Sequence, residues 1–221
     1  MNEELTIDQQ NALLYCLKKS HLFSKNVLPN LEAKMNSKGY VFNDILKIYD
    51  YLKNKVNVII HVNLEKALNF LCKDDFYRNQ FEVNTRREAL SPPTRIIWEN
   101  NLFNNIYQNT SGFDKVKYGV LNLTNDPRGV NSAYGYGDSY LVLKDENKYR
   151  ITFVFGDSSQ QDFHIATFDH FYHILYYIDD NLLNNLIKLS KGEIIDYKMN
   201  NYTYIEAQIH GPFGLKKILK Y

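Results

Sequence analysis

The chain has 221 residues, which is enough for one large domain or for a catalytic domain with a smaller appendage. Its formal net charge of +1 lacks the basic excess typical of proteins that bind nucleic acid or anionic membranes, so we expect neither partner. With 18 Tyr and 13 Phe against one Trp, the composition favours many half-buried strand positions.

The first 75 residues are predicted to be mostly helical. Apolar residues at helical spacing predict helical stretches over residues 6–22, 31–35, 43–55 and 63–71, with a short strand over 56–62. Thr6 and Gln9 have the spacing of a capping box, and Asn63 is placed to cap the last of these helices. No cluster of acids, bases or nucleophiles occurs here, so this segment is predicted to serve recognition or packing.

Strand patterns dominate the rest of the chain. A polar loop is predicted around Arg86, Arg87, Ser91, Pro92, Pro93 and Thr94, and a helix over 95–107. Strands are predicted over 116–123, 139–144, 149–156, 194–198, 202–210 and 215–219. Between the third and fourth of these, residues 168–191 have the pattern of two short helices that meet near Asp179 and Asp180. Strands with an inserted helical pair, behind a helical front end, predict an α+β protein.

Cysteine and histidine usage indicates neither a disulfide framework nor a metal site. Cys16 and Cys72 both fall in helical patterns, and we expect reduced, packed thiols in a cytosolic environment. His164, His170 and His173 suggest a metal site, but His170 and His173 fall in a helical pattern with no matching third ligand at a recognisable spacing, so no metal is expected. The first five residues have no basic region and no apolar run, so we expect no signal peptide, and no apolar stretch is long enough to span a membrane.

Residues 202–211 form the stretch with the most unusual predicted face. Strict alternation in a strand places Tyr202, Tyr204, Glu206 and Gln208 on one face, and Thr203, Ile205, Ala207 and Ile209 on the other. The second face is typical of a core. The first carries a carboxylate between a phenol and an amide, so it is either a ligand site or an exposed face of a Tyr-rich sheet.

Two glycines mark further candidate positions. Gly156, Asp157 and Ser158 follow an apolar strand, where they are consistent with close approach of a ligand or with a plain turn. Gly119 lies inside the predicted strand 116–123, where it indicates either a close approach or a bulge, and Tyr118 lies beside it.

Asp157 and Glu206 are therefore two carboxylates on separate strands, beside Tyr, Ser and Gln side chains. Such a pair suits chemistry that passes through a sugar oxocarbenium ion, because one carboxylate can stabilise the cation while the other orients or deprotonates the nucleophile. The chain has no dinucleotide-binding glycine motif, P-loop or nucleophile elbow. The residues thus allow glycoside transfer, without naming the sugar.

Several motifs, in this order, resemble those of the CteC-like ADP-ribosyltransferases, a group related to the poly(ADP-ribose) polymerase type. They are Tyr77-Arg-Asn-Gln-Phe81, Trp98-Glu-Asn-Asn-Leu-Phe103, Lys117-Tyr-Gly-Val-Leu-Asn-Leu123, Tyr140-Leu-Val-Leu143, Thr152-Phe-Val-Phe-Gly-Asp-Ser158 and Tyr204-Ile-Glu-Ala-Gln-Ile-His-Gly211. The resemblance covers roughly residues 76–221, and the last two motifs are the most specific.

The resemblance implies NAD as the substrate and a threonine of ubiquitin as the acceptor. By this resemblance, Glu206 would bind the nicotinamide-ribose hydroxyl and stabilise the oxocarbenium ion, with Asp157 as its partner carboxylate. Contacts to NAD would come from Tyr118, Gly119, Ser158, Tyr204 and Gln208. Asp138 is a rival for the Asp role, and Asp157 is preferred because the motif around it matches better. A tyrosine stands at 118 where related classes carry His or Arg, and the polar loop at 82–95 departs from the expected glycine-rich form.

The resemblance also implies an architecture, a split antiparallel β-sheet over 76–221. The helical segment 1–75 lies outside the resemblance and is predicted to be the partner-recognition module. The leading hypothesis is a monomeric mono-ADP-ribosyltransferase that acts in a cytoplasm, including that of a host cell into which it is delivered as a toxin-like effector. The alternatives are an NAD glycohydrolase and a non-catalytic module that binds a nucleotide or a protein.

Overall fold

A computed structural model describes residues 4–79, 81–83, 92–159, 164–196 and 202–215. Its helices are α1 (Ile7–Asn36), α2 (Phe42–Asn54), α3 (Leu64–Lys73), α4 (Pro92–Leu102), α5 (Tyr172–Tyr177) and α6 (Asp180–Ser190), with 3₁₀ helices η1 (Asn131–Tyr136) and η2 (Asp145–Arg150). Its strands are β1 (Asn57–Val62), β2 (Lys117–Asn122), β3 (Ser139–Val142), β4 (Ile151–Phe155), β5 (Ala166–Thr167) and β6 (Ile205–Ile209). The α+β class is therefore confirmed.

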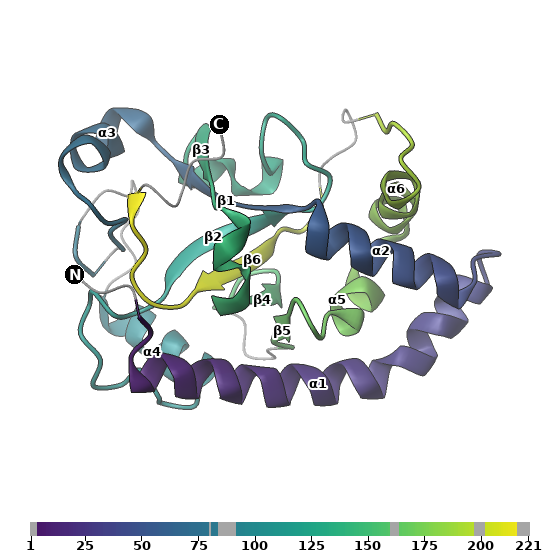
Figure 1. The fold of residues 1–221 in the computed structure, drawn as a ribbon, viewed down its shortest axis with the longest axis horizontal. Coiled ribbons are helices and arrows are strands. Elements are labelled where there is room, and N and C mark those ends of the chain that lie inside the picture. The colour runs from purple at the N-terminus through teal and green to yellow at the C-terminus, as the bar shows by residue number, and fades with distance from the viewer. Residues whose placement is uncertain (1–3, 80, 84–91, 160–163, 197–201, 216–221) are drawn as a thin grey trace.

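The strands form one six-stranded sheet in the order β3-β1-β2-β6-β4-β5 (Figure 1). Each neighbouring pair is antiparallel. Strand β6, the last strand among the described residues, lies in the interior of the sheet between β2 and β4, so its side chains contact neighbours from both flanking strands.

Helices cover the sheet and bring the N-terminal segment against the rest of the chain. Helix α1 runs along one side of the sheet and packs on α5 and β5, while α2 packs on α6 (Figure 1). Strand β1 belongs to the segment 1–75, yet it lies inside the sheet between β3 and β2. The assignment of a recognition role to residues 1–75 and a catalytic role to residues 76–221 stays a prediction. The two segments contribute to the same sheet and to the same main hydrophobic core.

The N-terminal helix is longer than predicted. The capping box forms as expected, because Thr6 Oγ1 accepts from the Gln9 amide at 3.3 Å and Gln9 Oε1 accepts from the Thr6 amide at 2.8 Å. The helix then continues through Pro29 to Asn36, so the separate helical run predicted at 31–35 is part of α1. Long-range packing of α1 against α5 outweighs the hydrogen bond that a proline removes.

Several other local predictions change in the structure. Pro92 and Pro93 begin α4 instead of lying in a loop, and the first turn of a helix tolerates proline because its N–H groups have no intrahelical partner. Residues 194–196 are not in a strand. Arg86, Arg87, Ser91 and most of the predicted strands at 194–198 and 215–219 lie outside the described residues. Cys16 is buried as expected, whereas Cys72 is exposed, and both are free thiols.

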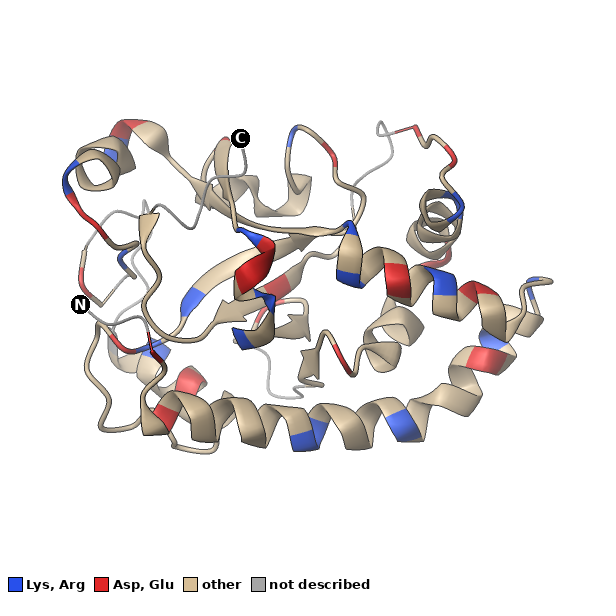
Figure 2. Ribbon diagram, viewed as in Figure 1, with Lys and Arg blue, Asp and Glu red and all other residues tan. Residues whose placement is uncertain are grey.

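Opposite charges are interspersed along the helices (Figure 2). Asp and Lys alternate along α2, and α1 carries both acidic residues and Lys, which fits the balanced net charge. None of the helices in the described part of the chain is long and apolar enough to cross a membrane.

Candidate active site

The predicted alternation of β6 places Glu206 on a face shared with residues of both neighbouring strands. Register pairs Glu206 with Val120 of β2 and with Val154 of β4, so these three side chains lie on the same face. The opposite face, with Ile205 and Ala207, joins the main core. All five residues of β6 are buried, so the carboxylate face is covered instead of exposed.

Val154 packs in a second apolar cluster that covers part of this face. The cluster joins Ala12 and Cys16 of α1 to Phe103 and Tyr107, which follow α4. The helices that the sequence indicated as packing elements therefore help to bury the polar face of β6.

Asp157 lies beyond the end of β4, after Gly156, whose φ of +77° favours glycine. Its Oδ2 accepts from the Tyr204 hydroxyl at 2.7 Å and from the Tyr136 hydroxyl at 3.4 Å, and its Oδ1 accepts from the Ser159 amide at 2.7 Å. Burial alone would raise the pKa of Asp157, but the hydrogen bonds from Tyr204 and Ser159 outweigh burial and lower it. Asp157 is therefore ionised at neutral pH.

Glu206 has the opposite environment, with only 5% of its surface exposed. Burial raises its pKa, and the nearby Asp157 charge adds to the rise, while Arg95 and hydrogen bonds from Ser158 and Gln208 oppose it. The Gln208 Nε2 donates to Glu206 Oε1 at 2.9 Å. The two predicted carboxylates thus lie close enough to interact, and their surroundings push their pKa values apart, as in sites that divide acid and base roles.

Arg95 lies beside Glu206, and the sequence analysis did not identify it as a site residue. Its guanidinium carbon lies 3.4 Å from the centroid of the Tyr118 ring, and its Nε lies 4.0 Å from Glu99 Oε1. Arg95 is 3% exposed, and its Nε has no hydrogen-bond partner in the described structure. The i,i+4 spacing of Arg95 and Glu99 was visible in the sequence, but such a pair usually lies on a solvated helix face.

Glu99 links Arg95 to a second buried cation. Glu99 Oε2 lies 3.2 Å from Lys115 Nζ, and Glu99 Oε1 accepts from the Tyr118 hydroxyl at 3.0 Å. Burial raises the pKa of Glu99, and the charges of Lys115 and Arg95 oppose that rise. The Tyr118 hydroxyl is therefore committed to Glu99, and the ring of Tyr118 supports the Arg95 guanidinium.

A cavity of about 30 Å³ opens beside Arg95, Tyr118 and Glu206. Its lining comes from β1, α4, β2, η1 and the β6 region: His61, Arg95, Tyr118, Gly119, Val120, Ala133, Tyr136, Tyr204 and Glu206. His61 fixes the η1 side, because its Nδ1 donates to the Gly137 carbonyl at 2.8 Å and its Nε2 accepts from the Val130 amide at 3.0 Å. This pairing requires a neutral imidazole, in agreement with a pKa that burial lowers.

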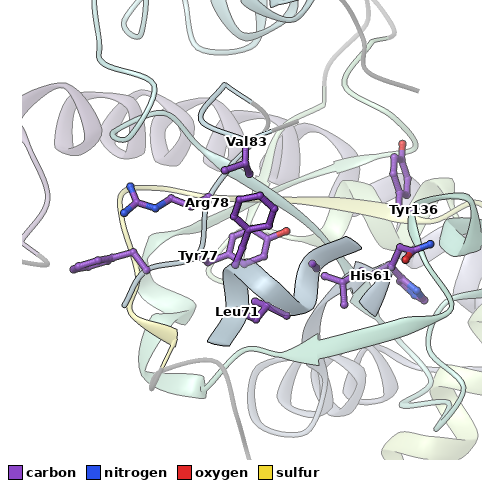
Figure 3. A pocket seen from close by; sticks show the side chains of 11 residues that line it. His61, Leu71, Tyr77, Arg78, Val83 and Tyr136 are labelled. Carbon is purple, nitrogen blue, oxygen red and sulfur yellow. The ribbon is translucent and has the colours of Figure 1, made fainter. Parts of the chain in front are cut away.

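A second hollow, of about 50 Å³, adjoins this cavity through His61 and Tyr136. Figure 3 shows these two side chains toward one end, with Tyr77, Arg78 and Val83 from the segment after α3 toward the other. Together the two hollows extend the polar site toward α3, which has no buried residue of its own.

The predicted site residues fall into two groups. Tyr118, Gly119, Tyr204 and Glu206 line the cavity, and Asp157 is hydrogen-bonded to Tyr204 at its edge. Gly119 lacks a side chain for a structural reason as well, since a Cβ there would lie 2.6 Å from the Ile59 carbonyl oxygen of β1.

Ser158 and Gln208 do not line the cavity. Both are buried, at 1% and 0% exposure, and both donate a hydrogen bond to Glu206. They therefore support the carboxylate and do not reach the space beside it. The rival Asp138 is exposed, outside the cavity, and accepts from the neighbouring Ser139 hydroxyl. The structure thus brings Asp157, and not Asp138, to Glu206.

No group of three His, Cys, Asp or Glu side chains suited to a metal occurs among the described residues. His173 instead contacts the Ser24 hydroxyl at 3.1 Å through Nδ1 and the Ile165 carbonyl at 3.1 Å through Nε2.

Comparison with known protein families gives a match. A family model described as "Protein of unknown function (DUF3626)" matches residues 60–180, which include the end of β1, all of α4 and β2, and Asp157 but end before Glu206. No curated protein matches the chain.

Proposed function

The chain belongs to the DUF3626 family of proteins of unknown function, and we propose that this member is a mono-ADP-ribosyltransferase that transfers ADP-ribose from NAD to a protein hydroxyl. The observation that carries the proposal is the buried Glu206 carboxylate, which lines the cavity, together with the ionised Asp157, which is hydrogen-bonded to the lining residue Tyr204. The motif resemblance to CteC-like enzymes supplies the identity of the sugar donor.

Glu206 is suited to the bond-breaking step. When the bond between the ribose C1′ and the nicotinamide nitrogen breaks, its electron pair leaves with nicotinamide and a positive charge develops on the ribose. A carboxylate whose ionised form is costly in the free protein gains most from such a charge, because burial leaves little water to compete. Glu206 would also accept a hydrogen bond from a ribose hydroxyl.

Asp157 is suited to the acceptor. Its low pKa keeps it ionised, and the Tyr204 hydroxyl at 2.7 Å holds its Oδ2 in place. In the proposed reaction, Asp157 orients the acceptor hydroxyl, whose oxygen forms the new bond to C1′ and whose proton passes to the carboxylate.

Arg95 is suited to hold the donor. Its buried guanidinium is stacked on Tyr118, and its Nε–H is available to a ribose or phosphate oxygen. A cavity of about 30 Å³ is much smaller than a dinucleotide, so binding requires side chains at its mouth to move. Tyr136, which is 40% exposed, is the lining residue placed to do so.

The proposed acceptor is a threonine of ubiquitin, on the precedent of the resembling family. Helix α3 supports a docking role for the N-terminal segment, because it leaves Leu64 and Leu68 exposed beside the hollow that adjoins the cavity. We propose that the protein acts as a monomer in a cytoplasm, including that of a host cell.

The test is incubation of the purified protein with NAD and ubiquitin, followed by intact mass of the ubiquitin. We expect one added ADP-ribose with the wild-type protein and none with Glu206→Gln or Asp157→Asn. Asp138→Asn is the matched control, since Asp138 is exposed outside the cavity, and it should retain full activity. Free ADP-ribose without labelled ubiquitin would indicate an NAD glycohydrolase. Untouched NAD would refute the proposal and favour a binding module, whose affinity should survive Glu206→Gln.

A further inference from the structure

Four buried side chains form a continuous series of hydrogen bonds that ends on Glu206. The series begins at Tyr107, whose hydroxyl lies 2.8 Å from His210 Nδ1, and His210 Nε2 lies 3.0 Å from Thr152 Oγ1. Thr152 Oγ1 donates to Gln208 Oε1 at 3.0 Å, and Gln208 Nε2 donates to Glu206 Oε1 at 2.9 Å. Tyr107, His210, Thr152 and Gln208 are all 0% exposed, so water cannot substitute for any of these partners.

The number of protons on each group fixes the direction of the series. A hydroxyl has one proton, and Thr152 gives its proton to Gln208, so Thr152 must accept from His210 Nε2–H. Burial lowers the pKa of His210 to about 3, so the ring is neutral and its Nδ1 carries no proton. His210 Nδ1 therefore accepts from the Tyr107 hydroxyl, and every bond in the series donates toward Glu206.

The reverse direction would place a lone pair against a carboxylate. If Thr152 gave its proton to His210, Gln208 Oε1 would lose its donor, and its carboxamide could turn over. Oε1 would then face the Glu206 oxygens, which repel it. The Phe103 ring packs on His210 at an interplanar angle of 76°, with the ring centroids 5.2 Å apart, and further holds the imidazole in place.

We propose that Tyr107 and His210 are positioning residues, which act through Thr152 to hold the Gln208 carboxamide with its N–H toward Glu206. The inference rests on the proposed function for its catalytic meaning, because it assigns Glu206 as the reacting carboxylate. The series favours the ionised form of Glu206, since each aligned bond presents its positive end toward the carboxylate.

Other charges also face Glu206, and the test must separate them from the series. Arg95 from α4 favours its ionised form, while Asp157 from the end of β4 opposes it. The phenol of Tyr118 from β2 also faces it. None of these three groups takes part in the series, so variants at Thr152 and Tyr107 leave them in place.

The experiment measures the titration of the Glu206 side-chain carboxyl by carbon NMR in the full chain, without NAD. Thr152→Val removes the hydroxyl and keeps the shape, and Thr152→Ser keeps the hydroxyl. We expect the midpoint to rise by about one pH unit in Thr152→Val, as for loss of a hydrogen bond to a charged group, and to stay near the wild-type value in Thr152→Ser. An equal midpoint in all three proteins would overturn the proposal.

Tyr107→Phe provides a second test if Thr152→Val does not fold. It leaves His210 Nδ1 without a donor, so both tautomers become accessible and the midpoint should rise by about half a pH unit. Tyr49→Phe is the matched control, because the buried Tyr49 hydroxyl has no hydrogen-bond partner in the described structure. A Tyr107→Phe midpoint no different from that of Tyr49→Phe would refute the role of Tyr107.

The same variants connect the series to activity. If the wild-type protein turns over NAD, the acid limb of its pH profile should move by the same amount as the Glu206 midpoint in Thr152→Val, and Thr152→Ser should restore it. If the protein does not turn over NAD, the proposed function fails while the NMR titration still decides whether the series orients Gln208. An NMR shift without a matching change in the pH profile of an active enzyme would overturn the catalytic part of the inference.

Discussion

The buried Glu99–Lys115 pair gives the sharpest test of the electrostatics around the site. Glu99 is 1% exposed and Lys115 is 5% exposed, and their charged atoms lie 3.2 Å apart. Lys115→Met removes the cation and keeps an unbranched chain of similar length. Because Lys115 Nζ also donates to the Tyr107 carbonyl at 3.0 Å, the variant leaves two buried acceptors with fewer donors.

The expected cost is about 3 kcal/mol of unfolding free energy at pH 8. Two unit charges 3.2 Å apart interact by at most about 5 kcal/mol at an effective dielectric constant of about 20, and breaking a buried pair typically costs about 3–5 kcal/mol. We take the low end because Arg95 at 4.0 Å and the Tyr118 hydroxyl at 3.0 Å remain with Glu99.

Protonation of Glu99 should make this cost depend on pH. The pKa of Glu99 is already raised by burial in the folded protein, and loss of Lys115 raises it further. When the pKa of a carboxyl is higher in the folded than in the unfolded protein, the free energy of unfolding falls as the pH rises above the unfolded pKa. Lys115→Met should therefore be less destabilised at pH 5 than at pH 8.

Urea unfolding, followed by the fluorescence of the single tryptophan, Trp98 of α4, measures these changes. Adding Glu99→Gln to Lys115→Met should recover at least half of the lost stability. Lys53→Met is the control, because Lys53 and its partner Asp169 are largely exposed and their pair contributes under about 1 kcal/mol. A Lys115→Met cost no larger than that of Lys53→Met at pH 8 would refute the reasoning.

Three further predictions concern other parts of the fold. Gly119→Ala should lower the free energy of unfolding in urea by about 2 kcal/mol, because the new methyl group would lie 2.6 Å from a β1 carbonyl oxygen. Gly135→Ala is the control and should change stability little, because the space around Gly135 is open. Equal costs for the two variants would contradict this prediction. The pKa of His210 is about 3 in the folded protein and about 6.5 in the unfolded chain. Only the unfolded chain therefore gains a proton here between pH 8 and pH 5, and the free energy of unfolding should fall by about 2 kcal/mol over that range. His210→Gln should lose this component of the pH dependence, measured by urea unfolding at both pH values, and an unchanged slope would count against it. A thiol reagent should label Cys72 rapidly and the buried Cys16 only after denaturation, as intact mass would show; rapid double labelling would place Cys16 at the surface.

Local signals in the sequence predicted the elements that depend on neighbouring residues. The Thr6–Gln9 capping box and the Asn63 cap form as expected, because a cap needs only residues within one turn. The alternation along β6 correctly separates Glu206 from its core-facing neighbours, because the strand period is fixed by the backbone.

Burial of charged side chains could not be predicted in the same way. Arg95, Glu99 and Lys115 resemble surface residues in sequence, and Lys117 is fully buried with its ammonium on the carbonyls of Phe113 and Lys115. Some of their partners are local, since Arg95 and Glu99 are four residues apart and Lys117 bonds carbonyls within four residues, but their burial comes from tertiary packing. The continuation of α1 through Pro29 has the same origin, since packing on α5 is a long-range contact.

The cost of this burial itself argues for a ligand site. A buried ion pair is often no more stabilising than apolar residues of the same volume, so stability alone gives little reason to keep Arg95 and Glu99 inside. The Arg95 Nε adds a further cost, because it donates no hydrogen bond in the described structure. A ligand oxygen in the adjoining cavity would remove that cost, and it would do so beside Glu206, where the proposed reaction needs the donor sugar to lie.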